Sequence, residues 1–243
     1  MARTSNRAIV PSPGDRVPVS LWLQLRTWMI ANDPDAAPML DWSRTIEPPP
    51  HADKLAGEIV WIILCAGKTA QAARTIETRV WDALDAGRPV VEAYGHRGRA
   101  AAIETVWHDR HRLFAELGEH LGDDDALLAW CRSLPWVGAI TCYQLAKNLG
   151  RDVPKPDIWL CRLAGIPDRP AGRTEERFAA CRDLCAPLAE ASGDRVAAVD
   201  SLLWLACNKG VLTVDAQAGP VVFNPRTITA RPIMSAFAPA PGN

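Results

Sequence analysis

The carboxylate of Asp157 lies at a predicted helix start, where it could take part in catalysis. Asp157 follows Pro156 at the start of the apolar segment DIWLCRLAG, after the short loop RDVPKP. An aspartate at a helix start accepts hydrogen bonds from the first backbone N–H groups, and a carboxylate fixed in this way can also stabilise positive charge or activate water. Asp157 is therefore predicted to cap a helix, and it is the candidate catalytic residue.

A tight turn lies just upstream of Asp157, in the stretch LPWVGAITCYQLAKNLG over residues 134–150. Proline and glycine interrupt the turn, and an amphipathic pattern follows that ends at Gly150, which predicts a hairpin between two helices. Such a turn exposes backbone N–H groups at a helix N-terminus, where the helix dipole also favours an anion. We expect the backbone from Val137 to Ile140 to bind one phosphate, with Gly138 permitting close approach.

Helices must position both features, and the sequence predicts an all-α fold. Apolar residues recur at helical spacing in six segments besides the hairpin, which are residues 19–32, 54–67, 69–87, 99–118, 174–191 and 194–209. Asp53 is predicted to cap the second segment, and one of Asp123, Asp124 and Asp125 to cap a helix that ends at Ser133. Residues 33–52 contain several prolines and are predicted to be an extended connection. No period-two strand pattern appears before residue 210.

The chain of 243 residues is long enough to bury a full core. Residues 1–18 are polar and contain proline, so they are predicted to form a flexible arm. Residues 19–212 are predicted to form one helical domain of two lobes, which includes the hairpin 134–150 and the catalytic loop 151–160. Residues 213–243 are predicted to be a tail with a small hairpin around VVF.

Charge excludes a global electrostatic attraction for nucleic acid. Lys plus Arg number 27 against 28 for Asp plus Glu, a net charge of -1, so any DNA-binding face must be a local patch. No apolar run approaches the length of a membrane span, and the N-terminus lacks a signal-peptide core. We expect a cytoplasmic monomer without membrane contact.

Seven cysteines are scattered through the apolar helical patterns, and most are predicted to be reduced thiols of the core. An iron–sulfur cluster is the alternative to weigh, on the four cysteines nearest the C-terminus. Cys161, Cys181, Cys185 and Cys207 lack the tight spacing of such a cluster. We therefore expect no metal and no cofactor.

The order and separation of these motifs resemble a known family. LPWVGAIT followed by KPDIWLCRL is similar to the hairpin and catalytic aspartate of the helix-hairpin-helix (HhH-GPD) DNA glycosylases, typified by endonuclease III and the alkylpurine glycosylases. EIVWIILCAGKTAQAARTI resembles the long buried helix and turn of that superfamily, and GHRGRAAAI resembles the segment before its next helix. The similarity covers about residues 55 to 210.

The resemblance implies an enzyme that flips a modified or damaged base out of double-stranded DNA and excises it. Asp157 then stabilises the positive charge that builds up on the sugar and orients a water. Bifunctional relatives carry a Schiff-base lysine before the hairpin threonine, but Ile140 precedes Thr141 here, which implies an abasic product without strand cleavage. Trp136 replaces the usual glycine of the hairpin, and Gly67 replaces a polar intercalating side chain.

The candidate binding residues fall into two groups. DNA contacts are expected from the hairpin and from basic residues near it, namely Trp136, Val137, Gly138, Ile140, Thr141, Lys147, Lys155, Arg97 and Arg99. A tryptophan can line a pocket for a flipped base or fill a helical core. Each of the four pocket candidates is therefore either a pocket residue or a core residue. They are Trp61, Trp107, Trp159 and Trp204. Lys209 is predicted either to touch DNA or to complement a helix C-terminus.

The sequence leaves open both the substrate and the functional class of the protein. The KPD-type loop also resembles a branch proposed to handle hypermodified pyrimidines of phage DNA, such as putrescinyl- or glutamyl-thymine, which implies phage base modification or antiphage defence. Repair of alkylated or oxidised bases is the rival substrate class. A non-catalytic DNA-binding module and a helical protein–protein adaptor are the alternatives of other classes.

Overall fold

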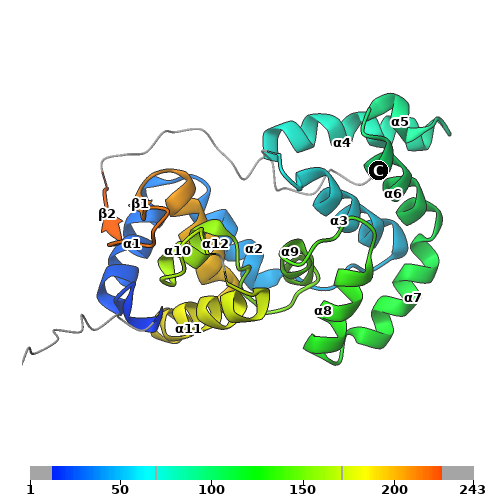
Figure 1. Ribbon diagram of the computed structural model, residues 1–243. Coiled ribbons are helices and arrows are strands. Elements are labelled where there is room, and N and C mark those ends of the chain that lie inside the picture. The colour runs from blue at the N-terminus through cyan, green and yellow to red at the C-terminus, as the bar shows by residue number, and fades with distance from the viewer. Residues whose placement is uncertain (1–12, 69, 171, 226–243) are drawn as a thin grey trace, which may run out of the picture.

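The computed structural model describes residues 13–68, 70–170 and 172–225, and helices dominate this part of the chain (Figure 1). A short 3-10 turn, η1 (Pro13–Asp15), comes first. The α-helices in chain order are α1 (Val19–Asn32), α2 (Ala36–Thr45), α3 (Ala52–Cys65), α4 (Ala70–Asp85), α5 (Val90–Ala93), α6 (Arg97–His108), α7 (Arg110–His120), α8 (Asp124–Ser133), α9 (Thr141–Asn148), α10 (Ile158–Leu163), α11 (Thr174–Ser192) and α12 (Val196–Asn208). The all-α prediction is confirmed for the described residues.

Most of the expected helices form within a few residues of their predicted bounds. The segments predicted at 19–32, 174–191 and 194–209 correspond to α1, α11 and α12. Asp123 caps α8 and accepts hydrogen bonds from the N–H groups of Asp125 and Ala126, as one of the three candidate aspartates was predicted to do. Periodicity and capping residues therefore predict these elements without further information.

Three predictions about helix bounds and caps are wrong. Residues 33–52 are not an extended connection, because α2 forms within them; Pro38 is the third residue of α2, where a missing N–H breaks no helical hydrogen bond. The N-cap of α3 is His51, whereas the predicted cap Asp53 pairs with Arg110. The segment 99–118 is divided between α6 and α7, with a break at Asp109.

Buried apolar side chains form two clusters. The first core is built mainly by α3, α4 and α6–α9, and the second core by α1, α2 and α10–α12. Figure 1 shows α4–α8 grouped on one side of the molecule and α1, α10 and α11 on the other, with α9 between them. Since α9 contributes to the first core and α10 to the second, the segment between these helices, residues 149–157, connects the two.

Both ends of the described chain pack on the second core. Val17 is fully buried, and Arg16 donates hydrogen bonds to the carbonyls of Leu163, Ala218 and Gly219. Residues 13–18 are therefore packed and are not part of a flexible arm; residues 1–12 lie outside the described chain. The predicted small hairpin around VVF is present, because β1 (Leu212–Thr213) pairs antiparallel with β2 (Val222–Phe223). Residues 226–243 of the predicted tail also lie outside the described chain.

No helix among the described residues is both long enough and apolar enough to cross a membrane.

Candidate active site

Asp157 has one carboxylate oxygen bound and one available. Its Oδ1 accepts hydrogen bonds from the backbone N–H groups of Trp159 (3.0 Å) and Leu160 (3.1 Å), so Asp157 is the N-cap of α10, as predicted. Oδ2 has no hydrogen-bond partner among the described residues. The cap fixes the orientation of the carboxylate and leaves an acceptor for a ligand.

The loop that leads to Asp157 is tied to its surroundings at several points. The ties run to α11, to α12 and to the residue before α12, and they use backbone groups of the loop as well as side chains. They are Arg195 Nη2 to Gly150 O (2.7 Å), Ala197 N to Asp152 Oδ1 (2.8 Å), Lys155 N to Asp200 Oδ2 (2.9 Å) and Arg177 Nη2 to Pro156 O (3.0 Å). A loop held in this way keeps Asp157 in one geometry, which catalysis requires.

Burial raises the pKa of Asp157, because desolvation disfavours the charged carboxylate. The positive charges of Lys155 and Lys147 lower the pKa, whereas the negative charge of Asp200 raises it further. A partly desolvated carboxylate interacts strongly with any cation that develops beside it. The electrostatics of Asp157 are thus those of a group suited to charge stabilisation.

The hairpin turn exposes backbone donors, at slightly different residues from those predicted. The N–H of Val137 donates to Leu134 O, and the N–H of Gly138 donates to Thr141 Oγ1 at 2.7 Å. The N–H groups of residues 139–141 have no acceptor among the described residues, and they stand at the N-terminus of α9. The open donors therefore run from Ala139 to Thr141, and Val137 and Gly138 shape the turn.

Trp136 joins the hairpin to α6. Its φ of 62° lies in the left-handed region that favours glycine, and its side chain is 48% exposed. The ring packs so closely on Gly98 that a Cβ there would lie 2.8 Å from Trp136 Cζ2. It also meets the His96 ring edge-on with centroids 5.1 Å apart, and the Arg99 guanidinium lies 5.4 Å from its centroid.

These contacts bring two predicted DNA-binding arginines next to the hairpin. Arg97 is exposed in the first turn of α6, and Arg99 donates to the hydroxyl of Tyr94 at 3.1 Å. Lys68, in the turn after α3, lies 5.6 Å from the centroid of the Tyr94 ring. We call this surface the basic patch; it consists of Lys68, Tyr94, His96, Arg97, Arg99 and Trp136. It gathers positive charge locally on a chain whose net charge is -1.

Two lysines predicted as DNA contacts have different surroundings. Lys147 is only 3% exposed, and its Nζ lies 2.5 Å from Asp200 Oδ2, so the prediction that it contacts DNA is wrong. Lys155 is half-buried, and its side chain makes no hydrogen bond or ion pair with a described residue. Lys209 is also buried, with Nζ 2.6 Å from Asp33 and 2.8 Å from Asp35, which excludes contact with DNA.

The four tryptophans predicted for a base pocket are spread over both cores. Trp61 is buried in the first core, and Trp107 packs edge-on against Trp81 with Arg110 over its face. Trp159 and Trp204 are half-buried at the margin of the second core. Trp159 lies closest in sequence to Asp157, and the Arg162 guanidinium is 5.0 Å from its centroid.

Sequence reasoning missed a polar network between α3 and α9. Gln144 Nε2 donates to Asn148 Oδ1 at 3.0 Å, and Asn148 Nδ2 donates to Glu58 Oε2 at 2.9 Å. Burial raises the pKa of Glu58. A carboxylate inside the otherwise apolar run EIVWIILC was the signal, because a charge on a buried helix requires a partner.

The cysteines of the considered cluster are buried thiols. Cys161 Sγ lies 3.9 Å from Cys181 Sγ and accepts a hydrogen bond from Arg177 Nε at 3.2 Å. The hydrogen bond between Cys161 and Cys181 and the hydrogen bond from Arg177 lower the pKa of Cys161, whereas burial raises the pKa of Cys207 to about 12. Among the described residues, no group of three or more His, Cys, Asp or Glu side chains could hold a metal ion.

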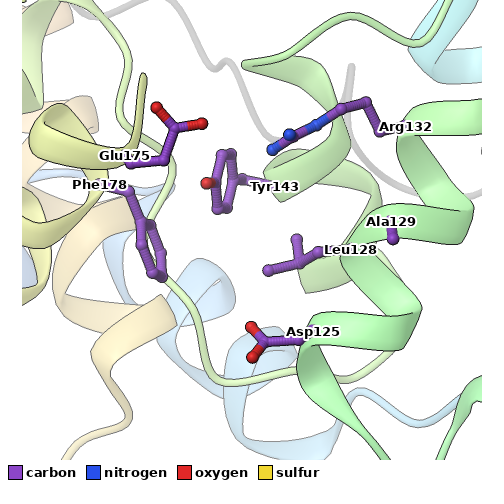
Figure 2. A pocket seen from close by; sticks show the side chains of 7 residues that line it. All are labelled: Asp125, Leu128, Ala129, Arg132, Tyr143, Glu175 and Phe178. Carbon is purple, nitrogen blue, oxygen red and sulfur yellow. The ribbon is translucent and has the colours of Figure 1, made fainter. Parts of the chain in front are cut away.

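A pocket of about 280 Å³ lies between α8, α9 and α11. Figure 2 shows Tyr143 between Glu175 and Arg132, with the ring of Phe178 beside it. The Tyr143 and Phe178 rings stack with centroids 4.6 Å apart. The residues that line this pocket are Asp125, Leu128, Ala129, Arg132, Tyr143, Glu175 and Phe178. Neither Asp157 nor any of the four tryptophans is among them, so this is not the predicted base pocket.

Comparison with protein-family models, with curated proteins and with solved structures found no match to this chain.

Proposed function

We propose that the protein is a monofunctional DNA N-glycosylase that flips a modified or damaged base out of the duplex and releases it. The observation that carries this proposal is the carboxylate of Asp157, on a loop tied to α11 and α12. Two N–H groups fix its Oδ1, and its Oδ2 has no partner in the described part of the chain. Asp157 stabilises the positive charge on the sugar as the glycosidic bond breaks and orients the attacking water.

The hairpin and the basic patch hold the DNA backbone in this proposal. The N–H groups of residues 139–141, which have no acceptor within the described ranges, bind one phosphate, and the helix dipole of α9 adds to the attraction. Arg97 and Arg99 bind neighbouring phosphates, since Trp136 keeps the start of α6 beside the turn. Lys155 supplies a further positive charge near Asp157.

The direct test is to incubate the purified protein with normal, damaged and phage-modified DNA and to identify released bases by mass spectrometry. Hypermodified phage DNA and DNA with alkylated or oxidised bases form separate arms, because both substrate classes are consistent with the proposal. We expect release of one class of base from duplex DNA. The absence of any released base in every arm would refute glycosylase activity.

The product should be an abasic site, with strand breaks only after alkali or an added abasic-site nuclease. Ile140 precedes Thr141 where a lyase lysine would stand, and Lys147 is held in its buried ion pair with Asp200. Borohydride should therefore trap no covalent protein–DNA adduct. A trapped adduct would contradict this prediction and would identify Lys155 as the amine to test by substitution.

Gly138→Val should weaken binding to all duplex DNA alike by about 10- to 100-fold, because it hinders hydrogen bonds to a charged phosphate. The turn tolerates the change, since an added Cβ would meet only Thr141 Oγ1, at 3.7 Å. Gly122→Val is the matched control, because Gly122 is also exposed in a turn before a helix and has open space around it. Equal affinities of the two variants, measured by fluorescence anisotropy, would argue against a phosphate at the hairpin.

A non-catalytic DNA-binding module is the second candidate, and one observation favours it. Capping of α10 already gives Asp157 a structural role. This candidate expects salt-sensitive DNA binding by the same hairpin with no base released from any DNA. The mass-spectrometric test separates the two candidates.

A further inference from the structure

A buried ion pair connects the hairpin helix, α12 and the loop before Asp157. Lys147 on α9 places Nζ 2.5 Å from Asp200 Oδ2 and 2.9 Å from Ser201 Oγ, both on α12. The same oxygen, Asp200 Oδ2, accepts the N–H of Lys155 at 2.9 Å. Lys155 is two residues before Asp157, so one carboxylate oxygen joins three elements of the candidate site.

The stability of the core does not require a buried ion pair at this place. Lys147 and Asp200 are 3% and 2% exposed, and an apolar pair of similar volume often gives equal or greater stability than a buried ion pair. Asp200 is also the one acidic residue of α12, in the run VAAVDSLLWLACN. A stabilising apolar residue would not, however, accept the N–H of Lys155. The ion pair thus provides a hydrogen bond to the loop that packing alone cannot provide.

We infer that Asp200, oriented by Lys147, is a positioning residue that holds the catalytic loop in a fixed position relative to the hairpin. The inference rests on the proposed base-release activity of Asp157. Binding of a phosphate at the N-terminus of α9 then fixes the same helix whose Lys147 orients Asp200. The distance between the bound phosphate and the catalytic carboxylate is thereby set by one rigid connection, as near-attack geometry requires.

The decisive variant is Lys147→Met/Asp200→Leu, which removes both charges together and leaves no unpaired ion. We expect base release per folded molecule to fall about 100-fold with DNA affinity nearly unchanged, because the carboxylate is misplaced. Lys147→Met/Asp200→Asn keeps an acceptor for the N–H of Lys155, and it should restore most of the rate. Recovery in this variant is a result that a purely structural role for the pair would not give.

The matched control is the other buried lysine with acidic partners. Lys209 pairs with Asp33 and Asp35, which precede α2, and no hydrogen bond of Lys209 or Asp33 reaches the catalytic loop within the described part of the chain. Lys209→Met/Asp33→Asn/Asp35→Asn removes a comparable buried ion cluster, so its base release per folded molecule should remain near that of the wild type. A loss equal to that of the Lys147 variant would assign both effects to general destabilisation.

Amide hydrogen exchange of Lys155 tests the tether without any substrate. The amide should exchange at least about tenfold faster in Lys147→Met/Asp200→Leu than in the wild type, and at a near wild-type rate in Lys147→Met/Asp200→Asn. Unchanged protection together with unchanged base release would overturn the inference. If the wild type releases no base, the proposed glycosylase activity fails, and the exchange rates still decide whether Asp200 holds the loop.

Discussion

Asp157→Asn should lower base release by about 10²- to 10⁴-fold while DNA affinity stays close to that of the wild type. Asparagine has nearly the same volume and is itself a favoured N-cap, so its side-chain oxygen can still accept the N–H groups of Trp159 and Leu160. The change removes the negative charge and little else. Single-turnover assays with excess enzyme, together with binding measurements on the same DNA, separate the chemical step from affinity.

The stability of this variant distinguishes a functional carboxylate from a structural one. Burial raises the pKa of Asp157, so the native protein binds this proton more tightly than the unfolded chain does. The carboxylate therefore costs stability above its raised pKa, and this cost disappears as the pH falls below the unfolded value. At pH 7 the Asn variant should be at least as stable as the wild type, and its advantage should shrink in acid.

The raised pKa of Asp157 also predicts how the rate of base release depends on pH. Because base release uses the charged form of Asp157, the wild-type rate should fall as the pH drops through the raised pKa. The residual rate of Asp157→Asn should not show this fall. Full activity in Asp157→Asn would remove the residue from the mechanism. A variant that melts well below the wild type at pH 7 would instead indicate that the charge serves the fold.

Helix positions and the cap by Asp157 were predictable because they depend on local patterns. The periodicity of α1, α11 and α12 and the turn before α9 can be read from neighbouring residues alone. By contrast, α2 was missed because the prolines around it suggested a break. A proline in the first helical turn costs no hydrogen bond, so Pro38 marks the start of α2 and does not prevent it.

The surroundings of the charged residues could not be predicted, because they depend on contacts between distant segments. Lys147 and Asp200 are 53 residues apart, and Lys209 lies 176 residues from Asp33. A lysine near a predicted DNA-binding turn looks like a phosphate ligand until its partner is known. The approach of Trp136 to Gly98 likewise joins segments that no local pattern connects.

Trp159→Ala should separate a pocket wall from a core residue when it is compared with Trp22→Ala. Trp22 is fully buried in the second core, and its truncation should cost about 3–5 kcal/mol of stability, a large part of a domain's total. Trp159 is half-buried at the margin of the same core, two residues after Asp157, with Arg162 near its ring. Its truncation should cost much less stability.

If the Trp159 ring stacks on the flipped base, its loss should weaken binding of the modified duplex by about 1–3 kcal/mol and lower base release with it. Binding of unmodified duplex should change little, because the hairpin and the basic patch are intact. Thermal melting and base release are measured on both variants, with rates expressed per folded molecule. A Trp159→Ala protein that melts as early as Trp22→Ala, yet releases bases normally, would make Trp159 a core residue and move the search for the pocket to the Glu58 and Asn148 network between α3 and α9.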